Sequence, residues 1–204
     1  MDNYVMIGGK RIELTEEQAA RILAENETKC EEICLADLAV GDTFRIGECE
    51  FLVLEQTGEA TTVIKKALLV ADMEFGENNN YAESQIRSTC EEFAEEIAKV
   101  VGPENILEHT VDLTSDDGLK DYGTIKSRCS LLTADLYRRY VEILDKFKPD
   151  SWWWLATAHS TKRHENDNWG KCVSPSGFVD NIYCGDVSGV RPFCILKSTI
   201  FVSK

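Results

Sequence analysis

The stretch WWWLAT, residues 152–157, decides how the last third of this chain folds. Three adjacent tryptophans followed by leucine are too apolar for a loop. Side chains alternate between the two faces of a strand, so alternate rings would enter the core while the neighbouring ring packs across the other face. We therefore predict a strand here, with at least two of the three indoles in the core.

Short apolar runs separated by Gly, Ser, Pro and Asn continue from Ser151 onward, as is typical of several short strands. Two polar segments, 159–171 and 180–188, lie between the hydrophobic runs 152–157 and 189–196. Their Asn, Asp, Ser, Gly and Tyr residues make adaptable contacts at little entropic cost. We predict two long loops on a rigid frame, which together bind a protein or glycan ligand.

The residues that we expect to contact this ligand are polar, aromatic or glycine residues of those two segments. They are His159, Asn166, Asp167, Asn168, Trp169, Gly170, Asn181, Tyr183, Gly185, Asp186 and Ser188. Ordinary solvated loops and plain core packing remain the alternative interpretation of the same residues. We predict no catalytic residue, no cofactor and no metal site.

The middle of the chain has strand character first and helix character afterwards. Between residues 40 and 64, turns at Gly47-Glu48 and Gly58 separate three apolar, partly alternating runs, which predicts an antiparallel meander. Two amphipathic helices follow, one stopped by Gly102-Pro103 and one capped by Thr133. Their predicted buried stripes are Ile86, Cys90, Phe93, Ile97 and Val101 in the first, and Leu136, Tyr140, Leu144 and Phe147 in the second. The fold class is therefore α+β.

The N-terminal residues form a separate predicted unit. A hairpin spans 4–14, because Gly8-Gly9 can adopt the positive φ angles of a tight turn. A helix follows, with Thr15 and Gln18 in the positions of a capping box. The two predicted parts of the chain are a hairpin-helix extension at 1–35 and a ligand-binding domain at 36–204.

Charge restricts the kinds of partner. The net charge is −14, yet residues 150–204 contain six Lys/Arg and five Asp/Glu, so residues 1–149 have a net charge of −15. Nucleic acid and anionic membranes both require a positive surface, so we exclude them as partners. The acidity belongs to the scaffold, while the nearly neutral tail contains all four tryptophans.

Motifs for metals and for catalysis are incomplete. The eight cysteines lack paired CxxC spacing, so we expect reduced, buried thiols. Residues 112–118 resemble the start of a calcium loop, but the twelfth position is Gly123 in place of an acid, which favours a solvated turn. None of the three histidines, His109, His159 and His164, lies in a recognisable catalytic motif.

Hydropathy gives an expectation about location. The longest apolar runs are too short to cross a bilayer, and the first ten residues lack the pattern of a signal peptide. We therefore expect cytoplasmic synthesis and no membrane insertion.

Several motifs resemble a known family. WWWLAT (152–157), VSPSGFV (173–179) and GVRPFCIL (189–196) resemble the "WWLRSP…GVRPAL" tail of uncharacterised proteins of gut Firmicutes and their phages, and VGDTFRIG (40–47) resembles that family's opening strand. That family is similar to the C-type-lectin-like fold of formylglycine-generating enzymes. Variable proteins of diversity-generating retroelements, such as phage receptor-binding proteins, share this fold. The resemblance implies small mixed or antiparallel sheets and two main helices over residues 36–204.

The resemblance also implies roles for residues. Trp153, Trp154 and residues 189–192 would be framework, with Arg191 tying the final strand to neighbouring carbonyls or a carboxylate. The ligand surface would lie on the loops. The loop residues are of types that the codons randomised by such retroelements can encode. Cys184 and Cys194 do not match the copper-binding cysteine pair of the enzymes, so their chemistry is not carried over. Residues 166–169 contain only a scrambled form of the calcium-lectin triplets.

The leading hypothesis is a non-catalytic ligand- or receptor-binding protein encoded by a phage or prophage, with a location on the phage particle. One alternative is an enzyme, either a divergent relative of the formylglycine-generating enzymes or a hydrolase using His159 or Cys184. Another is a structural particle component that assembles through residues 1–35. The sequence leaves open whether the chain forms a homo-oligomer.

Overall fold

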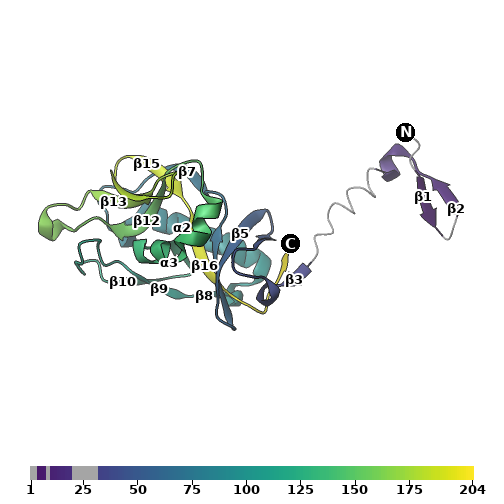
Figure 1. Ribbon diagram of the computed structural model, residues 1–204, viewed down its shortest axis with the longest axis horizontal. Helices are drawn as coiled ribbons and strands as arrows, with labels where there is room; N and C mark the ends of the chain where they lie inside the picture. The colour runs from purple at the N-terminus through teal and green to yellow at the C-terminus, as the bar shows by residue number, and fades with distance from the viewer. Residues whose placement is uncertain (1–3, 8–9, 20–31) are drawn as a thin grey trace.

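The computed structural model describes residues 4–7, 10–19 and 32–204. In this part of the chain two main sheets combine with the helices α2 (Gln85–Val101) and α3 (Ala134–Leu144), as Figure 1 shows. The α+β class expected from the sequence is confirmed. No helix among the described residues is both long and apolar enough to cross a membrane.

The larger sheet has eight strands in the order β11-β16-β6-β5-β4-β17-β3, with β8 also paired to β16. Its centre is the predicted meander, in which Phe44 faces Phe51 and Val53 faces Val63 across antiparallel strands. Gly47 and Gly58 adopt the positive φ angles that the turns require. The strands are β3 (Glu32–Cys34), β4 (Thr43–Ile46), β5 (Cys49–Gln56), β6 (Ala60–Lys65), β8 (Ile106–Leu107), β11 (Cys129–Leu131), β16 (Pro192–Lys197) and β17 (Phe201–Ser203).

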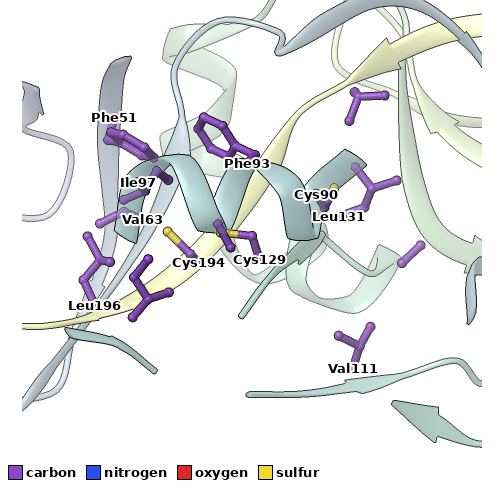
Figure 2. Close-up of a cluster of buried hydrophobic side chains, with 14 of the residues drawn as sticks. Phe51, Val63, Cys90, Phe93, Ile97, Val111, Cys129, Leu131, Cys194 and Leu196 are labelled. Atoms are coloured by element: carbon purple, nitrogen blue, oxygen red, sulfur yellow. The ribbon is translucent and has the colours of Figure 1, made fainter. Parts of the chain in front are cut away.

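Helix α2 packs against this sheet and covers its main core. The Ser84 hydroxyl caps the helix by accepting a hydrogen bond from the Arg87 amide at 3.2 Å, and Gly102 ends it with φ +88°. Figure 2 shows Phe93 and Ile97 of α2 beside Phe51 of the sheet. The buried residues of α2 are Ile86, Cys90, Phe93, Ala94, Ile97 and Ala98, so the predicted stripe is confirmed except at Val101, which is half-buried.

Cysteines contribute to the same core. Cys129 and Cys194 are cross-strand partners in β11 and β16, and Figure 2 shows their sulfur atoms close together beneath α2. Both are buried and free, as is Cys90. Burial raises the pKa of the Cys90 thiol to about 12, so it remains protonated at neutral pH. These thiols pack as small hydrophobic groups, as the sequence predicts; Cys30 lies outside the described residues.

The smaller sheet has five strands in the order β14-β13-β12-β15-β7. Its central strand contains the tryptophans. Trp153 and Trp154 are fully buried in two different clusters on opposite faces, and Trp152 is half-buried, which confirms the prediction for this strand. The strands are β7 (Val70–Glu74), β12 (Trp153–Ala158), β13 (Trp169–Val173), β14 (Val179–Tyr183) and β15 (Val187–Val190).

One prediction in this region is wrong. Residues 180–188 are not a long loop, because 180–183 belong to β14 and 187–188 to β15. The predicted loop 159–171 is also too long, because β13 begins at Trp169. The polar residues of β14 are compatible with a strand because β14 is at the edge of the sheet, where side chains on one face and the outer backbone meet water.

Helix α3 lies on the Trp153 side of the smaller sheet. The Thr133 hydroxyl accepts from the Leu136 amide at 3.2 Å, which confirms the predicted cap. The buried residues are Ala134, Tyr137, Tyr140 and Leu144. The predicted stripe therefore missed Tyr137, while its Leu136 and Phe147 are half-buried and pack against the same core. The Tyr137 ring meets the Trp153 ring edge-on at 5.7 Å, a contact between distant segments that helical periodicity alone does not reveal.

The N-terminal unit matches its prediction where the structure describes it. β1 (Tyr4–Ile7) pairs with β2 (Lys10–Glu13), which leaves the two glycines as the connection. Thr15 and Gln18 form the reciprocal bonds of the capping box, at 3.0 and 3.2 Å. The two glycines and residues 20–31 lie outside the described residues. A further two-stranded ribbon is formed by β9 (His109–Asp112) and β10 (Thr124–Ser127).

Candidate ligand-binding surface

Arg191 lies at one of the connections between the two main sheets. It lies between β15 of the smaller sheet and β16 of the larger one, and it is fully buried. Its Nε donates to the Lys65 carbonyl and its Nη2 donates to the carbonyls of Lys66 and Phe147, all at 3.0 Å. The guanidinium also lies over the Trp153 ring at 5.3 Å. These bonds confirm the framework role that the family resemblance implies for Arg191.

The most exposed aromatic residues in the strands of the smaller sheet form a pair across the edge strand β14 and its neighbour β13. Trp169 of β13 lies directly opposite Tyr183 of β14, and their exposed fractions are 41% and 46%. The rings meet edge-on with centroids 6.1 Å apart. Gly185 lies against the tyrosine, since a Cβ there would be 2.8 Å from the ring. We call Trp169 and Tyr183 the aromatic pair.

The face that presents the aromatic pair continues inward through polar residues. Lys171 and Asn181 are the next cross-strand partners on that face, because side chains two residues apart in a strand share a face. Lys171 is buried, and its Nζ lies 2.9 Å from Oδ2 of Asp116. Burial alone would raise the pKa of Asp116, but hydrogen bonds from Lys171 and Arg138 outweigh it and lower that pKa.

Asp116 also lines a polar cavity of about 450 Å³. The cavity lies at the N-terminal end of α3, where Arg138 bridges Asp116 and Asp135. Its remaining lining is rich in hydroxyl groups, contributed by Thr110, Thr114, Ser115, Thr133 and Thr157. The aromatic pair and this cavity are therefore linked through the ion pair between Lys171 and Asp116.

A buried asparagine holds the loop that precedes the aromatic pair. Asn79 is fully buried, and its Nδ2 donates to the carbonyls of Ser160 and Trp169 at 3.0 and 2.9 Å. Its Oδ1 accepts from the Tyr122 hydroxyl, and its amide donates to the Asp167 carbonyl. The sequence analysis missed Asn79, because its partners are at least 40 positions away along the chain.

The predicted ligand-binding residues differ in exposure. Asn168, Trp169, Tyr183, Gly185 and Asp186 are exposed, while His159, Asn166, Asp167 and Asn181 are half-buried.

Two residues of the predicted ligand-binding set are buried. Gly170 faces the core, where a Cβ would lie 3.1 Å from the Trp154 ring, and Ser188 is 2% exposed in β15. Both belong to strands where the prediction placed loops.

The acidic turn at 112–118 uses its carboxylates within the protein. Asp112 accepts from the Thr114 amide and hydroxyl, and Asp117 accepts from Ser115, Ser160 and His164. A group of three or more His, Cys, Asp or Glu side chains able to hold a metal ion is not found among the described residues.

The cluster of Asp117, Ser160 and His164 does not have the order of a hydrolase triad. The Ser160 hydroxyl donates to Asp117 at 2.7 Å, and it lies 3.4 Å from Nδ1 of His164, the nitrogen that faces Asp117. In a triad, the serine bonds the imidazole nitrogen opposite to the one that faces the carboxylate. Burial raises the pKa of Cys184 to about 12, which disfavours a thiolate nucleophile there. The geometry of this region suits stacking and hydrogen bonding to a ligand.

His109 is buried in the scaffold, away from the exposed residues of this surface. Its Nε2 lies 2.9 Å from the Ser130 hydroxyl, and its ring packs on Phe193 at 4.7 Å. Burial lowers the pKa of His109 to about 4.

This shift predicts a loss of stability in acid. Between about pH 6.5 and pH 4 the unfolded chain binds a proton at His109 and the folded chain does not, so stability is complete above this range and declines as the pH falls. Because of this lowered pKa of His109, we expect the free energy of unfolding to fall by about 2–3 kcal/mol between pH 7 and pH 4.5, as measured by urea denaturation. His109→Gln should lack this part of the decline, whereas the exposed His164→Gln should keep it. An equal decline in His109→Gln would disprove the assignment.

Comparison with known proteins gives no match to a family model, to a curated protein or to a solved structure. The fold and the surface therefore define this molecule as an α+β protein with an aromatic, polar face on its smaller sheet.

Proposed function

We propose that this chain is a non-catalytic binding protein whose aromatic pair contacts a protein or glycan ligand. The observation that supports this most directly is the exposure of two large aromatic rings side by side on paired strands. A sheet holds such rings with little loss of conformational entropy on binding, so more of the contact energy remains for affinity. Tyrosine and tryptophan are also the residues that contribute most often to binding hot spots.

The polar neighbours supply the directional contacts of the proposed site. Asn168 and Asp186 are exposed near the aromatic pair in sequence, and each lies within three residues of one of its members. Because Gly185 has no side chain, it does not cover the side of the Tyr183 ring that it faces. Apolar faces surrounded by amide and carboxylate groups suit both sugar rings and protein surfaces.

The finer assignment is to a C-type-lectin-like fold and to a phage- or prophage-encoded receptor-binding protein. Support comes from the motifs WWWLAT and GVRPFCIL and from the burial of Trp153, Trp154 and Arg191. Diversification by a retroelement would then act on the exposed positions, while the buried framework stays constant. Sequencing the neighbouring DNA tests this part, since a reverse-transcriptase gene and an imperfect copy of the coding segment for 152–196 are expected there.

The aromatic pair provides the direct test of binding. We expect Trp169→Ala/Tyr183→Ala to lower ligand affinity at least about tenfold, because two exposed hot-spot rings are removed together. Labelled full-length protein would be applied to a glycan array and to gut bacterial cells, and the ligand so found would be titrated. The melting temperature should change by less than about 4 °C, since neither ring is in the core.

Phe201→Ala is the matched control. Phe201 is also an exposed aromatic residue, at 67%, but it lies on β17 of the larger sheet. This variant should bind like the unchanged protein. Equal losses in both variants, or unchanged binding in the double variant, would contradict the proposed site.

A further inference from the structure

A second cavity, of about 610 Å³, lies between residues 66–68, which follow β6, and residues 146–151, which follow α3. The side chains of Leu68, Phe147 and Pro149 give it apolar walls. Its volume is within the range of roughly 300–1,000 Å³ that is typical of small-molecule sites. We call it the lysine pocket, after the residues described next.

The lysine pocket is positive although the chain as a whole is strongly acidic. Its lining contains Lys66, Lys146 and Lys148 against Glu50 and Asp150, whereas the whole chain has a net charge of −14.

The three lysines differ in their partners. Lys66 Nζ lies 2.7 Å from Glu50, and Lys148 Nζ lies 3.5 Å from Asp145. Lys146 is exposed, and no carboxylate among the described residues lies within ion-pair distance of it. One ammonium group at this pocket is thus free to meet an anion.

A buried positive charge lies beneath the same pocket. Arg191 donates hydrogen bonds to the carbonyls of Lys66 and Phe147, two residues of the pocket lining. All of its bonded acceptors are neutral carbonyls, and its Nη1 is buried with no hydrogen-bond partner in the described part of the chain. A buried charge without a counter-ion is costly, and an anion held nearby would reduce that cost.

We propose that the lysine pocket binds a small ligand that joins a flat apolar body to one anionic group, such as an aryl carboxylate. The apolar body packs on Leu68 and Phe147, and the carboxylate is attracted by Lys146 and by the buried Arg191. An inorganic anion alone would leave the apolar walls in water, and a neutral aromatic compound would make no use of the positive charge. This site shares no residue with the aromatic pair and is independent of the proposed function.

The test uses the full chain and two matched probes, 2-naphthoate and its uncharged analogue 2-naphthamide. Amide chemical shifts in a ¹⁵N-labelled sample would follow each titration. We expect 2-naphthoate to bind with a Kd of about 1 mM or tighter and to shift the amides of 66–68, 146–148 and 150–151. The amide analogue should bind at least about fivefold more weakly, and raising the salt from about 20 to about 300 mM should weaken only the naphthoate.

Charge-reversal variants test the role of the lysine. Lys146→Glu should weaken 2-naphthoate binding at least about fivefold. Lys162→Glu, the same change at an exposed position in the 161–168 loop, should alter it less than about twofold. Trp169→Ala/Tyr183→Ala should leave naphthoate binding unchanged, which separates this proposal from the proposed function. Equal binding of the two probes, an unchanged Kd in Lys146→Glu, or no shifts at 66–68, 146–148 and 150–151 at about 10 mM naphthoate would overturn the proposal.

Discussion

Replacing Arg191 with methionine is expected to lower the free energy of unfolding by at least about 4 kcal/mol. The substitution keeps most of the side-chain volume, so little of this loss comes from a cavity. Methionine also removes a buried charge without a counter-ion, which offsets only part of the loss. It removes the donors for the carbonyls of Lys65, Lys66 and Phe147, and each buried acceptor left without a partner costs about 1–3 kcal/mol. These carbonyls belong to two segments, residues 65–66 and residue 147, which would lose their hydrogen bonds to the connection between β15 and β16.

Urea denaturation followed by tryptophan fluorescence measures this loss. Arg191→Lys should give an intermediate loss of about 2–3 kcal/mol, because one ammonium group cannot reproduce the geometry of a fork that reaches three acceptors. Lys162→Met, an exposed change of the same charge, should change stability by less than about 0.5 kcal/mol. A loss below about 1.5 kcal/mol in Arg191→Met would show that water satisfies the freed carbonyls.

Trp154→Ala should cost about 4 kcal/mol, which makes it the second large effect. The indole is fully buried and meets the Phe75 ring edge-on at 5.2 Å. The indole packs directly on the backbone at Gly170, where a Cβ would lie only 3.1 Å from the ring. The space left by removing the indole would therefore not be filled by neighbouring side chains without a shift of β13.

Positions 152 and 154 offer matched controls for this prediction. Trp154→Phe keeps an aromatic ring but loses the bond from the indole Nε1 to the Met73 carbonyl at 2.7 Å, so we expect a loss of about 1–2 kcal/mol. Trp152→Ala removes a half-buried indole two positions away and should cost less than half as much as Trp154→Ala. Similar losses at positions 152 and 154 would mean that the difference in burial between these two rings, which pack against the same cluster, does not control stability here.

Both predictions concern the support of the proposed binding surface. β12 pairs directly with β13, which presents Trp169, and Asn79 ties the intervening loop to both ends. A variant that loosens this frame would lower ligand affinity by increasing the entropy lost on binding. For that reason, binding measurements on the aromatic pair are informative only when the melting temperature is measured on the same samples.

Local pattern was sufficient for several of the regular elements of this protein. The caps at Thr133 and Thr15, the stop at Gly102 and the burial of Trp153 and Trp154 depend on residues within a few positions of one another, where spacing and backbone preference act directly. The same reasoning failed at 180–188, because the Asn, Asp and Gly residues there are typical of loops. Pairing with β13 outweighed that preference.

The sequence by itself therefore determined the α+β class, the meander, one end of each main helix and the tryptophan strand. Only the tertiary structure decided that Trp169 faces Tyr183, that Lys171 meets Asp116, and that Arg191 holds carbonyls from segments 44 and about 125 positions away. These contacts join distant segments, and which partner each side chain meets depends on how the two sheets pack, a property that no short window of sequence contains.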